Sequence, residues 1–165
     1  MKNIPKTIWI LMGMALVLRV AFLVAIIFSQ GEEALLVSDA PRFYKIVQAL
    51  VAGHGFTLGD PPFAPSAFFP PVFLSVLGGS LALSGSVIPA VLLHIVLGSL
   101  LPLLVWKIAG FITQDFRVRF LAASLAVFEP QMILWSIVPT TEMIATFTLV
   151  SALYFFLKIL KNFQW

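Results

Sequence analysis

The chain has 165 residues, of which 61% are hydrophobic and only 10% are charged, and its mean hydropathy is +1.06. Soluble domains carry about 25% charged residues, so this composition predicts an integral membrane protein. The chain has no cysteine, which excludes disulfides and cysteine metal sites. Its net charge of +3 comes from ten basic residues scattered near the ends of apolar segments, so we expect no nucleic-acid partner.

The first predicted membrane span covers residues 7–28, where one charge, Arg19, interrupts the apolar run. About 22 helical residues rise roughly 33 Å, which is enough to cross the hydrocarbon core. A cleaved signal peptide is the alternative, but its apolar region is usually about 7 to 15 residues long and lacks a central arginine. We therefore expect an anchor helix. Because an unpaired cation inside a bilayer is costly, we expect Arg19 to pair with Glu129 or Glu142, or to bind an anionic headgroup.

Residues 29–86 form the segment with the most polar side chains. An amphipathic helix is predicted over 41–52, since Pro41 favours a first helical turn and Gly53 favours a helix end. A short apolar helix is predicted over 72–84. It would reach only about 20 Å, less than the roughly 30 Å hydrocarbon core, so we expect a re-entrant or interfacial helix here.

Three further apolar runs predict spans over residues 87–112, 120–137 and 142–160. With four spans in total, the basic residues near the span ends share one side of the membrane: Lys2, Lys6, Lys107, Arg117, Arg119, Lys158 and Lys161. The positive-inside rule makes that side cytoplasmic. The sequence thus predicts an all-α, multi-pass protein of the plasma (inner) membrane with one membrane domain, both termini cytoplasmic and an outer-face loop over 29–86.

Asp39 is the candidate catalytic residue. It precedes the predicted 41–52 helix, where a carboxylate commonly caps the first backbone N–H groups. A carboxylate at the membrane surface can also act as a general base or a metal ligand, and both roles can coexist with a cap.

The two histidines carry weaker signals. His54 lies exposed between two glycines, with no second histidine or carboxylate at ligand spacing, so it does not define a metal site. His94 lies within an apolar run and is expected to be a buried, hydrogen-bonded side chain. No motif for nucleotide binding, zinc proteolysis or α/β-hydrolase chemistry is present, so we expect no nucleotide cofactor.

An ordered set of features extends over nearly the whole chain. It comprises Arg19 in the first span, Asp39 before a helix that ends Ala-Leu-x-x-Gly-x-Gly-Phe, Phe69-Pro70-Pro71-Val72-Phe73, Phe128-Glu129-Pro130, and Pro139-Thr140-Thr141-Glu142-Met143. Each feature alone is weak, and the ordered set is moderately specific. The set resembles the polytopic GT-C glycosyltransferases, in the branch of the dolichyl-phosphate-mannose protein mannosyltransferases and the lipid A aminoarabinose transferase.

The resemblance implies an inverting glycosyltransferase that takes a polyprenyl-phosphate sugar as donor on the outer face of the membrane. Asp39 would orient or deprotonate the acceptor, or bind a divalent metal where the subfamily uses one. The candidate substrate-binding residues are Arg19, Arg42, Tyr44, His54 and Glu142. That fold has many more spans, so we expect this chain to correspond to its N-terminal part. The chain would then be a truncated piece, one that another membrane subunit completes with the missing spans, or a small derivative that has lost activity.

Two other functions remain open. A non-catalytic membrane module would bind a polyprenyl lipid or a partner membrane subunit without turnover, and Asp39→Asn would leave its function intact. A small transporter component is favoured by Arg19 and Glu129 within the membrane segments, and is disfavoured by the lack of an inverted repeat.

Overall fold

The structure is a computed structural model that describes residues 4–66 and 69–163, and within them it contains helices and no strand. Three helices are long and apolar enough to cross a membrane: α1 (Lys6–Gln30), α4 (Ile88–Ile112) and α7 (Glu142–Phe163). A fourth crossing exists if the bent pair α5 (Phe116–Phe128) and α6 (Pro130–Ile137) is one span. The structure therefore confirms an all-helical protein with three to four helices that can span a membrane.

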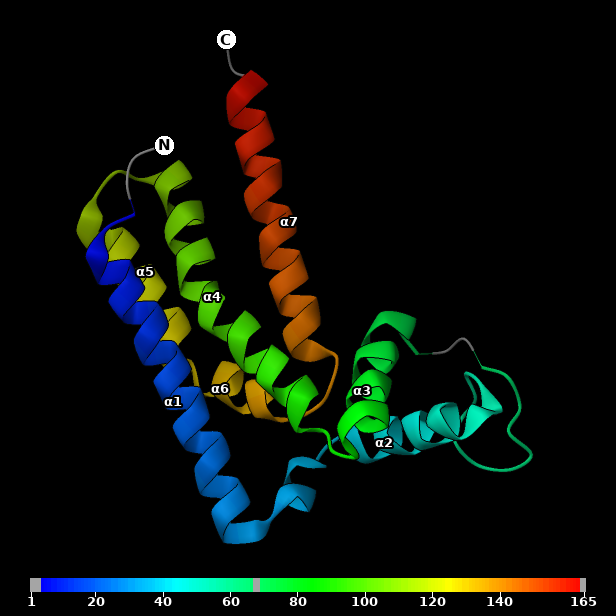
Figure 1. The fold of residues 1–165 in the computed structure, drawn as a ribbon. Coiled ribbons are helices and arrows are strands. Elements are labelled where there is room, and N and C mark those ends of the chain that lie inside the picture. The colour runs from blue at the N-terminus through cyan, green and yellow to red at the C-terminus, as the bar shows by residue number, and fades with distance from the viewer. Residues whose placement is uncertain (1–3, 67–68, 164–165) are drawn as a thin grey trace.

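Helix α4 is the central helix of the bundle. Helices α1, α5, α6 and α7 all pack against it, and both described chain ends lie at the same end of the bundle (Figure 1). Helix α7 leaves most of its apolar surface uncovered, including Leu149, Phe155 and Phe156, which are each more than half exposed. Apolar surface of this extent requires lipid or another membrane protein around it.

The run predicted as one span over 120–137 is two helices, and the first of them begins earlier, at Phe116. The two helices meet at an angle of 45° around Glu129. Pro130 has no N–H to donate and disfavours helical backbone at the residue before it, so Glu129 is extended, with a ψ of 115°. The Glu129 carboxylate then caps α6 by accepting a hydrogen bond from the backbone N–H of Met132.

The segment between α1 and α4 contains a small helical unit. Helix α2 (Ala40–Ala49) continues into a π-helical turn, η2 (Leu50–His54), which ends where Gly53 adopts a φ of +89°. Helix α3 (Pro71–Ser84) packs on α2 (Figure 1). These helices correspond to those predicted over 41–52 and 72–84. At 14 residues, α3 is about 21 Å long, which is too short to cross the membrane alone.

One apolar core joins this unit to the membrane helices. Most of its buried residues come from α1, α2, α3 and α4, and they include Leu23, Phe43, Ile46, Phe73, Leu77, Val91 and Ile95. Phe43 is central to it, because its ring packs edge-on against Phe69 and Phe73, with centroids 5.4 and 5.0 Å apart. This packing holds α2 against α3.

Glu32 links the end of α1 to the start of α4. It lies in a 3-10 turn, η1 (Glu32–Leu35), and its Oε1 accepts hydrogen bonds from the Val87 backbone N–H and the Ser86 hydroxyl, each at 2.8 Å. We expect Glu32→Ala to lower the free energy of unfolding by about 1–2 kcal/mol, because charge-assisted bonds to a helix start are lost. Tryptophan fluorescence during thermal unfolding in detergent measures this change.

The matched control is Glu33→Ala, since Glu33 lies in the same turn with an exposed side chain. It should change the free energy of unfolding by less than about 0.5 kcal/mol. Equal effects of the two substitutions would show that the Glu32 contacts to α4 contribute nothing specific.

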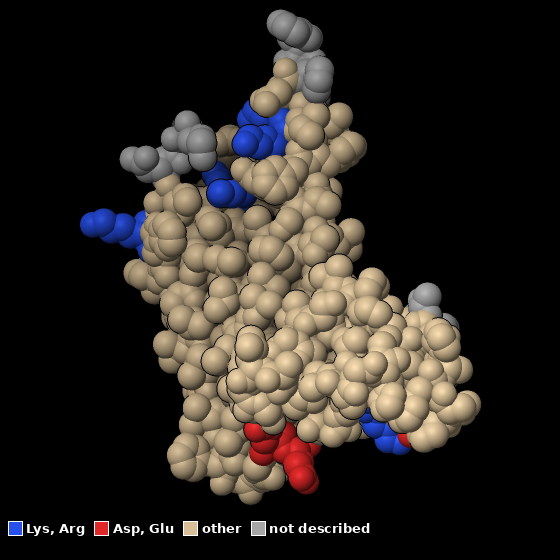
Figure 2. All heavy atoms as spheres, turned by 45° about the vertical axis from the view of Figure 1, so that its right-hand side comes forward, with Lys and Arg blue, Asp and Glu red and all other residues tan. Residues whose placement is uncertain are grey.

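Charge is separated along the molecule. Figure 2 shows Lys and Arg side chains at the end where α1 begins and α7 ends, and acidic side chains at the opposite end. A smaller group of basic and acidic side chains lies on the side of the molecule formed by α2 and the loop that follows it. The two ends are therefore chemically distinct.

Candidate functional site

Asp39 lies exposed at the start of α2, directly after Ser38, whose φ is +58°. The predicted side-chain cap is wrong, because the Asp39 carboxylate makes no capping hydrogen bond. Its backbone is already helical (φ −84°, ψ −8°), and its carbonyl oxygen accepts from the N–H groups of Arg42 and Phe43. A capping residue normally has extended backbone that turns its side chain toward these N–H groups. The Asp39 carboxylate is thus left exposed to solvent.

Arg42 lies three residues after Asp39, which places both on neighbouring positions of one helix face. Its guanidinium carbon lies 4.7 Å from the ring centroid of Phe69. The arginine side chain is exposed. Phe69 precedes Pro70, so this cation–π contact brings Arg42 to the start of α3.

An apolar groove of about 410 Å³ begins at Pro70 and runs between α3 and α7. The residues that line it are mostly apolar or small: Pro70, Val72, Phe73, Thr141, Ile144, Ala145, Thr148, Leu149 and Ala152. The lining residues that belong to α7 recur every three or four residues, so they share one face of that helix. The groove therefore has the surface chemistry that accommodates a hydrocarbon chain.

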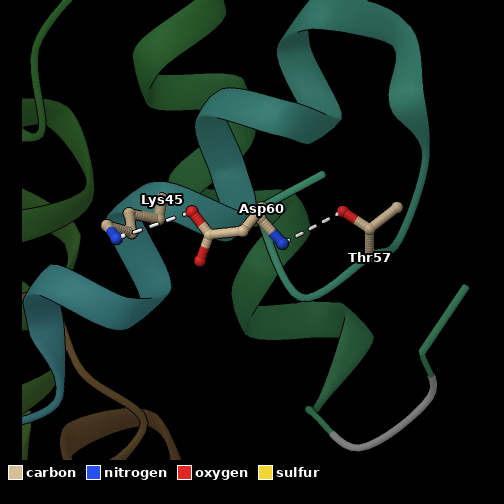
Figure 3. A network of polar contacts seen from close by, with 4 residues as sticks. Lys45, Thr57 and Asp60 are labelled. Atoms are coloured by element: carbon tan, nitrogen blue, oxygen red, sulfur yellow. Dashed lines mark hydrogen bonds and ion pairs between the residues drawn. The ribbon is translucent and has the colours of Figure 1, made fainter. Parts of the chain in front are cut away.

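A loop packs on α2 and forms with it a hollow of about 450 Å³ beside Arg42 and Lys45. Lys45 Nζ lies 3.6 Å from Asp60 Oδ1, and the Gly59 N–H donates to Thr57 Oγ1 (Figure 3). Both ionic side chains are more than half exposed, so this pair contributes little to stability. Gly59 has a φ of +91°, and a Cβ there would lie 2.9 Å from the Lys45 carbonyl carbon, so glycine permits the close approach.

Tyr44 and His54 lie away from Asp39. Tyr44 is half-buried and packs on the apolar core. His54 is exposed at the far end of η2, about 20 Å from Asp39 along the helix, and its ring stacks on Phe63 with centroids 3.8 Å apart. The structure therefore does not bring His54 and Asp39 together.

Arg19 is completely buried in the bundle. Its Nε donates to Ser136 Oγ at 2.9 Å and its Nη1 to the Ala15 carbonyl at 3.1 Å, while Nη2 has no partner among the described residues. The predicted direct ion pair is not formed. Glu129 acts on Arg19 electrostatically from beyond ion-pair distance.

A second group of buried polar atoms lies where α6 leads into α7. The Thr140 hydroxyl and the Glu142 Oε2 are buried without a hydrogen-bond partner among residues 4–66 and 69–163. His94 is buried beside them, under the electrostatic influence of Glu142. The predicted burial of His94 is confirmed. The Val138 backbone is its neighbouring hydrogen-bond acceptor, but neither ring nitrogen forms a hydrogen bond of good geometry with a described residue.

The described part of the chain contains no group of three or more His, Asp or Glu side chains that could hold a metal ion. A divalent metal at Asp39 would therefore have fewer than three His, Asp or Glu ligands among the described residues. Sequence reasoning missed Ser136 and Gly98, which surround Arg19, because serine and glycine within apolar runs are too common to single out.

The structure thus places Asp39 at the start of α2 and Arg42 and Lys45 within that helix. The apolar groove begins at Pro70, the residue after the Phe69 ring that Arg42 contacts. Glu142 begins α7 directly after Thr141, which lines this groove. Arg19 lies inside the bundle and His54 at the far end of η2. Comparison of the chain with known protein families, characterised proteins and solved structures finds no match.

Proposed function

We propose that this chain binds a polyprenyl-phosphate sugar and takes part in transferring the sugar to an acceptor, as the N-terminal module of a GT-C-type glycosyltransferase. One observation carries the proposal: Arg42 contacts Phe69, and the next residue, Pro70, begins the apolar groove. A cation at the head of an apolar groove complements an amphiphile with an anionic head and a long hydrocarbon tail. A polyprenyl phosphate is such a molecule.

The roles of the side chains follow from the chemistry of transfer. The bond between the anomeric carbon and the phosphate oxygen breaks while the acceptor oxygen bonds to the opposite face of that carbon. Asp39 takes the proton of the acceptor hydroxyl as general base. Arg42 and Lys45, on the same helix, offset the negative charge that develops on the leaving phosphate.

The proposal includes a membrane orientation. The basic end of the molecule faces the cytoplasm under the positive-inside rule, so both termini are cytoplasmic and α2 lies at the outer face of the plasma (inner) membrane. The exposed apolar face of α7 offers a surface for lipid or for a partner membrane subunit that carries further spans.

Asp39→Asn is expected to lower sugar transfer by about 10²–10⁴-fold, because the general base is lost. The assay follows radiolabel from polyprenyl-phosphate mannose or polyprenyl-phosphate aminoarabinose into membrane acceptors, using native membranes that contain the full chain. Donor binding, measured by photocrosslinking of a polyprenyl phosphate, should stay within about twofold. Glu33→Gln, at another exposed acid, is the control and should leave transfer unchanged.

A non-catalytic binding module is the second candidate, and the open, exposed position of Asp39 favours it. Arg42→Gln separates the candidates when it is compared with Asp39→Asn. Both functions require that Arg42→Gln weaken crosslinking of the polyprenyl phosphate by about tenfold, since a charge-assisted contact is lost. Asp39→Asn should abolish cellular function if the chain is an enzyme, and should leave it intact if the chain is a binding module. Normal crosslinking to the Arg42→Gln variant would contradict both candidates.

A further inference from the structure

A second hollow, of about 550 Å³, lies at the end of the molecule opposite α2. It is formed between α4, α5 and α7, and the residues that matter are Lys107 and Gly110 of α4, Arg119 of α5, and Tyr154 and Lys161 of α7. Figure 2 shows the basic side chains gathered at this end. The proposed sugar-transfer site does not use any of these residues.

The three cations of this hollow have no acidic partner among the residues that the structure describes. No acidic side chain lines the hollow, and within the described ranges none of the three makes an ion pair. Each instead lies over an aromatic ring: Arg119 over Trp106 at 3.9 Å, Lys107 over Tyr154 at 5.3 Å, and Lys161 over Phe111 at 5.8 Å. Cation–π contacts hold cations in place without neutralising them. The hollow therefore presents positioned positive charge.

Arg119 has hydrogen-bonding capacity left over. Its Nη2 makes one long bond, 3.4 Å, to the Trp106 carbonyl, and its buried Nε has no partner among the described residues. A Cβ at Gly110 would lie 2.9 Å from Nη2, so the glycine provides the space that lets the guanidinium lie against α4. An anion in the hollow would find an arginine that is already positioned.

The surroundings indicate what carries the anion. The hollow lies toward the ends of α4 and α7, two of the helices that are long and apolar enough to cross a membrane, and a bilayer places its headgroups at such ends. Next to it, the last turns of α7 expose Phe156, Ile159 and Leu160. Basic pockets between membrane helices bind anionic headgroups when acyl chains can lie along the neighbouring helix. We propose that this hollow binds the phosphate of an anionic phospholipid, with its acyl chains along the exposed face of α7.

The test is native mass spectrometry of the purified chain after incubation with equal amounts of phosphatidylglycerol and phosphatidylcholine of identical acyl chains. The wild type should retain phosphatidylglycerol preferentially. The double variant Lys107→Gln/Lys161→Gln should lose about fivefold in phosphatidylglycerol affinity for each lysine removed. The control Arg117→Gln/Lys158→Gln removes the same charge from exposed positions outside the hollow and should stay within about twofold.

A second variant keeps every charge. Gly110→Ala displaces the Arg119 guanidinium, which is the mobile end of a flexible side chain, so it should weaken phosphatidylglycerol retention while the unfolding temperature changes little. Equal retention of the two lipids by the wild type would overturn the proposal. So would equal losses in the double variant and its control, or unchanged retention by the double variant and Gly110→Ala. Binding of millimolar inorganic phosphate together with equal retention of the two lipids would assign the site to free phosphate and reject a lipid site.

Discussion

Arg19→Met is expected to leave the free energy of unfolding unchanged or raise it, by up to about 4 kcal/mol. The side chain is fully buried, and among the described residues it forms no ion pair and its Nη2 has no hydrogen-bond partner. Replacing a buried charge by an apolar side chain of similar length removes its desolvation penalty. Ser136 keeps a partner after the change, because its hydroxyl donates to the Met132 carbonyl. Thermal unfolding in detergent, followed by tryptophan fluorescence, gives the comparison.

The matched variant is Ser136→Ala, which removes the acceptor of the Arg19 Nε and leaves the cation in place. It should lower the free energy of unfolding by about 1–3 kcal/mol. The Arg19 Nε would lose its hydrogen-bond acceptor and would join Nη2 as a buried donor without a partner among the described residues. The opposite order, with Arg19→Met more destabilising than Ser136→Ala, would show that Arg19 stabilises the bundle. If Arg19→Met is stable and sugar transfer is nevertheless lost, then Arg19 serves function at the expense of stability, as its predicted role in substrate binding requires.

Gly98→Ala is expected to lower the free energy of unfolding by about 1–3 kcal/mol through overpacking. A Cβ at this position would lie 2.8 Å from Ser136 Oγ, 2.9 Å from Arg19 Nε and 3.3 Å from Met143 Cε. These atoms belong to α6, α1 and α7, so the glycine of α4 lies where four helices meet. Neither Ser136 nor Arg19 can move away without breaking the hydrogen bond between them.

Gly13→Ala is the control for this substitution. Gly13 lies inside α1, and a Cβ there would meet no atom within 4 Å. Alanine favours a helix interior over glycine by about 0.5–1 kcal/mol, so the control should be neutral or stabilising. If Gly98→Ala behaves like Gly13→Ala in the same unfolding measurement, the close packing around Arg19 is not a determinant of stability.

The membrane helices were the most predictable part of the fold. The spans predicted over 7–28 and 87–112 agree with α1 and α4 to within two residues at each end. The length of an apolar run is visible in the sequence and directly limits what can cross a bilayer. The bend at Glu129 was predictable as well, because the following proline disfavours a continuous helix, but the apolar run on both sides obscured it.

The candidate site was predictable only where its residues are neighbours in sequence. Asp39 and Arg42 are three residues apart on one helix, so their proximity follows from helix geometry. The apolar groove is different, because it joins Pro70 to Leu149, and the contact of Arg42 with Phe69 depends on how a loop returns to α2. Helical periodicity does not predict such contacts between segments that are distant in sequence.

The amino-acid sequence alone was sufficient to predict an all-helical chain with several apolar helices that could span a membrane, the positions of most of those helices and the grouping of basic residues at their ends. Hydropathy and charge are local properties, and a bilayer acts on them segment by segment. The tertiary structure decided that Arg19 contacts Ser136, 117 residues away, and that Lys107, Arg119 and Lys161 surround one hollow. These contacts depend on how each helix is rotated about its axis and at what angle it crosses its neighbours. A uniformly apolar helix surface does not specify either quantity.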